Sequence, residues 1–201
     1  MAYRRDMRAP PIDYGILRAA LVQSVRTATG LGQNAVVMSE PEEPIGQRAQ
    51  PPFATIKITT AAIKYGRDAL TYAGAPGNEE GVFRYSGPRG MICAFDFFGR
   101  SHEEAYQLAA AYQAGLDQEH VYDPLRTGGL SVWRVDQVVD LSALLSTGYE
   151  GRAHFTVQFG LQAVSLVDVG FIAHVPAKGA VQGAIGDAAR IAFTADLSSE
   201  D

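Results

Sequence analysis

Asp96 and His154 are the residues of this sequence best suited to acid–base chemistry, and Arg152 lies two positions before the histidine. Asp96 interrupts an otherwise apolar run, and a buried carboxylate without a partner is costly. With Arg152 or His154 beside it in a pocket, this carboxylate could act as a general acid or base in a small enzyme. An aspartate in such a run more often pairs with an arginine or caps a loop, so we favour a structural role.

Residues that bind metals or act as nucleophiles are sparse. The single cysteine, Cys93, has no partner for an intrachain disulfide and lies in the apolar run 91–95, which predicts a buried, unreactive thiol. The sequence contains neither an HExxH nor a CxxC motif. The four histidines are scattered along the chain: His102, His120, His154 and His174. We therefore predict no metal site, no cofactor and no catalytic residue.

Three glycines near the C-terminus, Gly179, Gly183 and Gly186, have part of the spacing of a phosphate-binding loop. No Gly-Lys-Ser or Gly-Lys-Thr follows them, and no apolar strand runs directly into them. The segment 176–201 is rich in Ala and Gly, and we interpret it as a flexible C-terminal extension.

The length and composition favour one folded domain. With 201 residues, of which 47% are hydrophobic, the chain can bury a core over 13–175, preceded by a mostly polar N-terminal arm, 1–12. The net charge of −5 argues against a protein that wraps nucleic acid, since that requires clustered Lys and Arg. No apolar run reaches 18 residues and the N-terminus lacks the apolar core of a signal peptide, so we expect neither a membrane span nor export.

Two helices are predicted by their apolar spacing and their caps. The first covers 14–29, with Asp13 as N-cap and Gly30 as C-cap. The second covers 102–117, where Ser101 and Glu104 form a capping box.

Strands are predicted where apolar residues alternate or β-branched residues dominate. The clearest alternation follows Tyr149, where 153, 155, 157, 159 and 161 are all apolar. This strand either ends near 165, before a second strand, or continues as one long bent ribbon. The weaker pair 68–72 and 81–85 predicts a hairpin arm, and 39–50 and 141–146 are interpreted as loops. The remaining predicted strands are 34–38, 53–60, 90–98, 130–139, 152–165 and 167–175.

These elements define an α+β fold, with a mixed, mostly antiparallel sheet packed against two main helices. Their order resembles that of the tail terminator (neck) proteins of tailed bacteriophages. The resemblance covers 13–175. It rests on Pro52-Phe53-Ala54-Thr55, on the strand Met91 to Phe98 with its following helix, and on Tyr149-Glu150-Gly151-Arg152-Ala153 with Phe155.

The resemblance implies a structural virion protein. Such proteins form a ring, usually of six copies, that caps the head-proximal end of the tail tube, stops its polymerisation and gives the head a joining surface. The implied partners are the tail tube protein, the sheath protein where one is present, and connector or adaptor proteins. The implied location is the virion neck, after assembly in the host cytoplasm, with DNA sliding through an acidic lumen without specific binding. The alternatives are another head–tail joint protein, such as an adaptor or tail completion protein, or a small cytosolic enzyme.

For the assembly hypothesis we predict that a few residues of the sheet lie at subunit contacts. Aromatic residues can be core residues or interface anchors. For Phe97, Phe98 and Trp133 we favour the core. Charged residues would fix ion pairs or register between subunits. The predicted contact residues are Phe97, Phe98, Arg134, Glu150 and Arg152.

Overall fold

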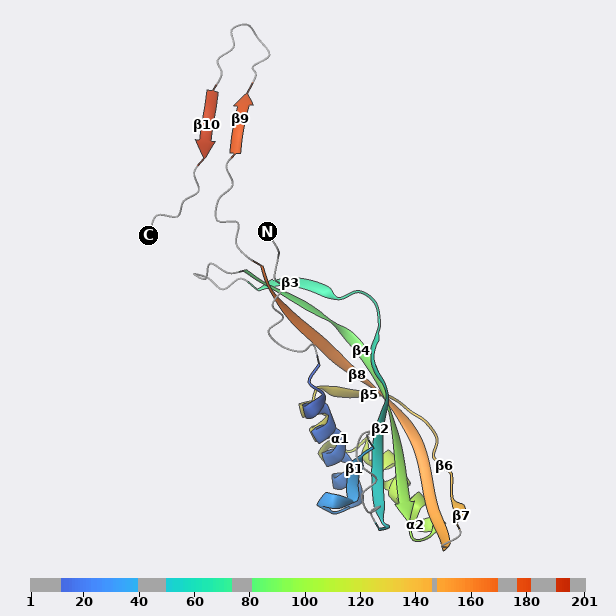
Figure 1. Ribbon diagram of the computed structural model, residues 1–201. Helices are drawn as coiled ribbons and strands as arrows, with labels where there is room; N and C mark the ends of the chain where they lie inside the picture. Colours follow the sequence, from blue (N-terminus) through green and yellow to red (C-terminus); the bar gives the residue numbers. More distant parts are fainter. Residues whose placement is uncertain are drawn as a thin grey trace.

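The computed structural model describes residues 12–39, 50–73, 81–145, 148–169, 177–181 and 191–195. It confirms the α+β class: three α-helices pack on a mixed, mostly antiparallel sheet. Figure 1 shows the helices gathered beside the lower half of the long strands β4 and β8, whose upper half extends beyond them. The predicted division of the chain into arm, domain and extension stays a prediction.

The two predicted helices begin at their predicted caps. Helix α1 spans Tyr14–Thr29; Asp13 accepts hydrogen bonds from the amides of Gly15 and Ile16, and Gly30 ends the helix with φ of 71°. Helix α2 spans His102–Gly115. The hydroxyl of Ser101 accepts from the amide of Glu104 at 3.2 Å, and the Glu104 carboxylate accepts from the amide of Arg100 at 2.6 Å. Both helix starts therefore follow from local side-chain chemistry.

A third helix, α3 (Glu119–Thr127), was not predicted. It is short and contains Pro124, which has no amide hydrogen to donate and usually marks a break. Only Val121 and Leu125 of this helix are buried among its otherwise polar residues. The helix persists because these two side chains pack against α1 and the sheet.

The sheet has the strand order β1-β2-β4-β8-β5, with β3 paired to β4, and β6 and β7 paired to β8. Only the β1–β2 pair is parallel. A 3₁₀ turn, Gln33–Ala35, precedes β1. Strands β9 and β10 pair antiparallel with each other. The strands are β1 Val36–Met38, β2 Phe53–Lys64, β3 Ala69–Ala73, β4 Gly81–Gly99, β5 Leu130–Val135, β6 Val139–Asp140, β7 Ala143–Leu145, β8 Gly148–Val169, β9 Ala177–Val181 and β10 Ile191–Ala195.

Several strand boundaries differ from the predictions. The segments 81–85 and 90–98 are one strand, β4, which passes through Gly87 and Pro88 without a shift in its pairing to β8. Strand β8 is the long ribbon that we kept as an alternative; the part predicted for 170–175 lies outside the described residues. The strand predicted over 130–139 breaks after Val135, and the predicted loop 141–146 contains β7. Pairing along a strand of this length overrides local break signals such as Gly-Pro.

The core lies between the helices and one face of the sheet. Its centre is an aromatic group in which the Phe95 and Phe97 rings lie 5.7 and 5.9 Å from that of Phe155, and Tyr112 of α2 packs on all three. The hydroxyl of Tyr112 is satisfied by Ser24 of α1 at 3.1 Å. Cys93 is fully buried, as predicted, and burial raises its pKa to about 12.

Candidate functional site: the helix-free face and the arm

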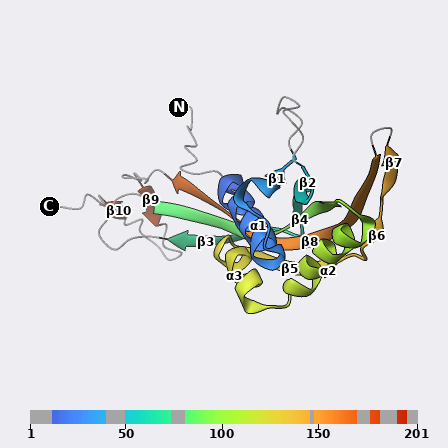
Figure 2. The same cartoon turned by 90° about the horizontal axis from the view of Figure 1, so that it is seen from below.

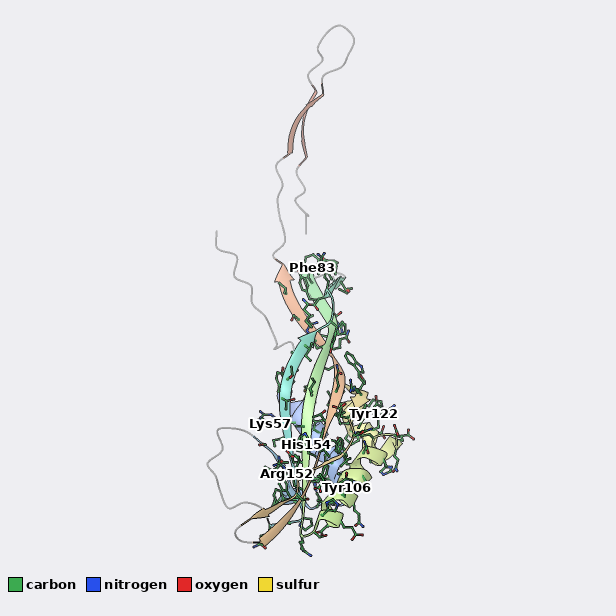
Figure 3. All side chains as sticks on the ribbon, turned by 90° about the vertical axis from the view of Figure 1, so that its right-hand side faces the viewer. Lys57, Phe83, Tyr106, Tyr122, Arg152 and His154 are labelled. Carbon is green, nitrogen blue, oxygen red and sulfur yellow. The ribbon has the colours of Figure 1, made fainter. Side chains whose placement is uncertain are left out.

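The sheet has one face that packs on the helices and one that carries none. Alternate residues of β4 and β8 point to the helices and are buried, whereas Asp96, Arg152 and His154 lie on the other face and are partly exposed. Figure 3 shows Lys57, Arg152 and His154 on the strands, with Tyr106 and Tyr122 on the helix side. Figure 2 shows α2 and α3 together on one side of the long strands. We call the other side the helix-free face.

The structure brings together the three residues considered for acid–base chemistry. Asp96 and His154 are directly opposed on β4 and β8. One carboxylate oxygen, Asp96 Oδ1, accepts hydrogen bonds from Arg152 Nε at 3.0 Å and Nη2 at 2.9 Å, and lies 2.9 Å from His154 Nδ1. The Arg152 guanidinium also lies over the Phe98 ring, 5.4 Å from its centroid. An ion pair with an arginine is one of the two structural roles that we favoured for Asp96.

A second polar cluster lies beside the first, where β5 meets β8. Asp136 accepts hydrogen bonds from Arg134 Nε at 2.9 Å and from the Thr156 hydroxyl. These contacts, chiefly that of Thr156, lower the pKa of Asp136 below its ordinary value. Arg134 is therefore in an ion pair, as predicted, but within its own chain. Its side chain is 75% exposed, so it remains accessible to a neighbour.

An aromatic pair covers the middle of the helix-free face. Gly90 and Gly160 are opposed on β4 and β8, and a β-carbon at either position would overlap the ring of Tyr65 or Trp133, respectively. The two rings meet edge to face at 5.4 Å, and Gln158 donates to the Tyr65 hydroxyl at 2.8 Å. The two glycines therefore make room for rings that lie close against the sheet.

The remaining predicted contact residues, and Trp133, which was assigned to the core, lie in different places. Phe97 is 0% exposed and lies in the core, as favoured. Phe98 is 6% exposed but is buried on the helix-free face, where its ring stacks on that of Phe53 at 4.4 Å beneath Arg152. The predicted place of both near a subunit contact stays a prediction. Trp133 is 47% exposed, so its assignment to the core was wrong: it follows Val132, which packs on the core, and by strand alternation its ring lies on the helix-free face, over Gly160. Glu150 lies on β8, opposite Ala143.

Sequence reasoning predicted the hairpin arm but missed its surface. The arm consists of β3, the first part of β4 (81–89) and the last part of β8 (161–169), hydrogen-bonded in that order. Leu70 is opposed to Tyr85, and Tyr72 to Phe83, so these four side chains share one face. Leu70, Tyr72 and Tyr85 are 55%, 58% and 38% exposed. The signal was present as alternation on both strands, but it becomes a patch only when the register is known. We call these four residues the arm patch.

A network of charged groups holds the base of the arm. Asp68 receives hydrogen bonds from Arg89 at 2.9 Å and from Lys64 at 3.1 Å. The Arg89 bond, and then the Lys64 bond, lower the pKa of Asp68 to about 2. The turn between β2 and β3 is thereby tied to β4.

We expect Asp68→Asn to destabilise the chain near neutral pH and to have progressively less effect in acid. Because the folded-state pKa of Asp68 lies below the ordinary value of 3.8, its stabilising effect is complete above pH 3.8 and is lost as the pH falls toward about 2. Urea unfolding of both proteins between pH 7 and pH 2.5 measures the difference. In a chain that also carries Arg89→Gln, the stabilising effect of Asp68 should be lost at a higher pH, because Arg89 is the main cause of the lowered pKa. A difference that is constant with pH would contradict this assignment.

Arg152→Ala should lower the free energy of unfolding by about 1–2 kcal/mol, because the largely buried Asp96 carboxylate then keeps only His154 as a partner. Arg134→Ala is the matched control: its ion pair is more exposed, and the expected change is within about 0.5 kcal/mol. Urea unfolding measures both. Equal losses would show that Asp96 does not depend on Arg152.

Two shallow hollows lie away from the Asp96 cluster. One, of about 430 Å³, is at the β5–β8 edge and includes Leu130, Trp133 and Leu161. The other, of about 510 Å³, follows α3. Within the described residues, no group of three or more His, Cys, Asp or Glu side chains is placed to hold a metal ion. No described helix combines the length and the apolar character needed to cross a membrane.

On the helix-free face, Asp96, Arg152 and His154 are engaged with one another, while aromatic side chains are exposed on that face and on the arm, as is typical of surfaces that contact other proteins. Comparison with protein families agrees, because the family model described as phage neck terminator protein matches residues 16–183. The chain belongs to the phage neck terminator family, which is a family of structural proteins, and the suspected resemblance is confirmed. No curated protein matches the chain.

Proposed function

We propose that this chain forms a ring, of six copies by family resemblance, that caps the head-proximal end of the phage tail tube. The ring would end polymerisation of the tube and offer the joining surface for the head. Its partners would be the tail tube protein, the sheath protein where there is one, and connector or adaptor proteins. DNA would pass through the lumen without specific binding, in keeping with the net charge of −5.

The family match over 16–183 carries the proposal. Two features of the structure support it. The arm extends a strongly apolar patch beyond the part of the sheet that the helices cover (Figure 1). Tyr65 and Trp133 add exposed aromatic surface to the helix-free face. Exposed aromatic clusters of this kind are typical of protein contacts.

The proposal is tested by the mass of the purified chain and by its effect on tail tubes. We expect light scattering after size exclusion to give a ring, either alone or on addition of tubes, and negative-stain images to show it at one tube end. Capped tubes should no longer lengthen when tube protein is added. A monomer that is indifferent to tubes would contradict the proposal. A ring that binds head connectors and leaves tube growth unchanged would instead indicate an adaptor.

A further inference from the structure

The arm patch gathers four apolar side chains on one face of the arm, and Leu70, Tyr72 and Tyr85 are each more than a third exposed. Tyr72 and Phe83 meet edge to face at 5.4 Å, and Leu70 and Tyr85 continue the patch toward the base of the arm. Figure 3 places Phe83 near the end of the ribbon, far from Tyr106 and Tyr122 on the helices. A thin ribbon of strands gains little burial by itself, so a patch of this kind is stabilised by a partner.

A complementary surface lies at the other end of the same ribbon. The hollow of about 430 Å³ at the β5–β8 edge is lined largely by apolar groups, among them Tyr122, Leu130, Trp133 and Leu161. Strand β5 is the last strand of the sheet on this side and pairs only with β8 in the described sheet. The hollow therefore lies beside a free sheet edge. Together, the hollow and this edge offer an apolar seat and unpaired backbone groups.

The charges near the two surfaces are opposite in sign. On the arm, Asp68 is already paired with Arg89 and Lys64, while Arg67 and Arg84 are exposed. Beside the hollow, α3 and the turn before it carry an acidic group, one member of which, Asp123, is bonded to Arg126. The acidic residues are Asp117, Glu119 and Asp123. Opposite charges at the two sites favour the encounter of one with the other.

One copy cannot bring its own patch to its own hollow. Pro88 and Gln162, at the root of the arm, line the hollow, whereas Phe83 lies five residues further along β4. At about 3.3 Å per residue this separates them by roughly 16 Å along a continuous ribbon that does not bend back. A contact between two different surfaces of identical chains is heterologous, and it closes into a ring when the rotation permits.

We infer that the arm patch of one copy binds the α3–β5 hollow of a neighbouring copy. This inference rests on the proposed ring and names the surfaces that build it. The occupant of the hollow is a second copy of this chain, because the chain itself supplies both the apolar patch with its basic neighbours and an apolar seat with an acidic group beside it.

The first test removes the patch. The variant Leu70→Ser with Tyr72→Ser should lose at least ten-fold in ring population, measured by light scattering at a concentration where the unmodified chain is a ring. Its circular dichroism should remain that of the folded chain. The matched control is Tyr14→Ser with Ile16→Ser, which removes side chains of similar exposure, 36% and 54%, from α1 and should leave the ring intact.

The outcomes separate this inference from the proposed function. A ring that survives loss of the arm patch, or that dissociates equally in the control, overturns the inference and leaves the capping function standing. A chain that stays monomeric with and without tail tubes overturns both.

The second test locates the contact. In a chain carrying Leu70→Cys and Arg126→Cys, mild oxidation should produce a ladder of intermolecular disulfides on a non-reducing gel. The native Cys93 adds no background, because it is fully buried with a pKa of about 12. A chain carrying Ile16→Cys and Arg126→Cys is the control. A ladder at least ten-fold weaker in the control supports the inference; no ladder, or equal ladders, overturns it.

Discussion

Replacing Phe155 with alanine should lower the free energy of unfolding by about 3–5 kcal/mol. The Phe155 side chain is 1% exposed and points from β8 toward the helices. Its ring centroid lies 5.7, 5.9 and 6.0 Å from those of Phe95, Phe97 and Tyr112. Its removal opens a cavity between the sheet and α2 that rigid aromatic neighbours fill only in part. Urea unfolding followed by circular dichroism measures the loss.

Gln162→Ala is the control for this experiment, because its side chain lies on the same strand but is exposed. We expect a change within about 0.5 kcal/mol. A loss of less than about 1 kcal/mol for Phe155→Ala would contradict the central place of this ring in the core.

The parts of the fold that the sequence predicts well are those with local causes. The start of α1 follows from the Asp13 carboxylate and the start of α2 from Ser101 and Glu104, so a few adjacent residues suffice. The helix-facing half of β8 follows from a strict alternation of apolar residues, which are buried as expected.

The parts that the sequence did not predict depend on contacts between distant segments. Helix α3 has few apolar residues and an internal Pro124, and it is stabilised by packing on α1. The continuity of β4 through Gly87 and Pro88 depends on its pairing with β8. Local propensity is a weak guide at such places, because tertiary packing outweighs it.

The candidate site shows the same division. Asp96 and Arg152 could be named from residue type alone, and a pair with an arginine was one of the two structural roles favoured for Asp96. Trp133 could not be placed from its residue type, since its face depends on the pairing of β5 with β8: Val132 is opposed to Phe159 of the core, so the next side chain lies on the other face. To predict the arm patch, one would need to know that Leu70 is opposed to Tyr85 and that no described helix covers them. Neither fact follows from one segment of the chain alone.

Gly151→Ala should destabilise the chain by about 1–3 kcal/mol, although it adds only a methyl group. Gly151 lies opposite Gly99 where the start of α2 crosses the sheet. A β-carbon there would overlap the Ser101 carbonyl and the His102 amide, which are backbone atoms of the N-cap and first turn of α2. No rotation of a side chain relieves this overlap, so α2 must shift or β8 must bend.

Gly32→Ala is the matched control, because nothing lies within 4 Å of a β-carbon at that position and its φ of −64° suits alanine. This variant should be as stable as the unmodified chain, or more stable by about 0.4–1 kcal/mol. Thermal and urea unfolding of the two variants therefore separate steric packing from the general effect of replacing a glycine. Equal changes in both would mean that α2 is not held against β8 at this point. The stretch Tyr149-Glu150-Gly151-Arg152-Ala153 is one of those that carried the family resemblance. The predicted difference would give a physical reason for its glycine: the backbone at the start of α2 packs directly against β8 at this position, with no space for a β-carbon.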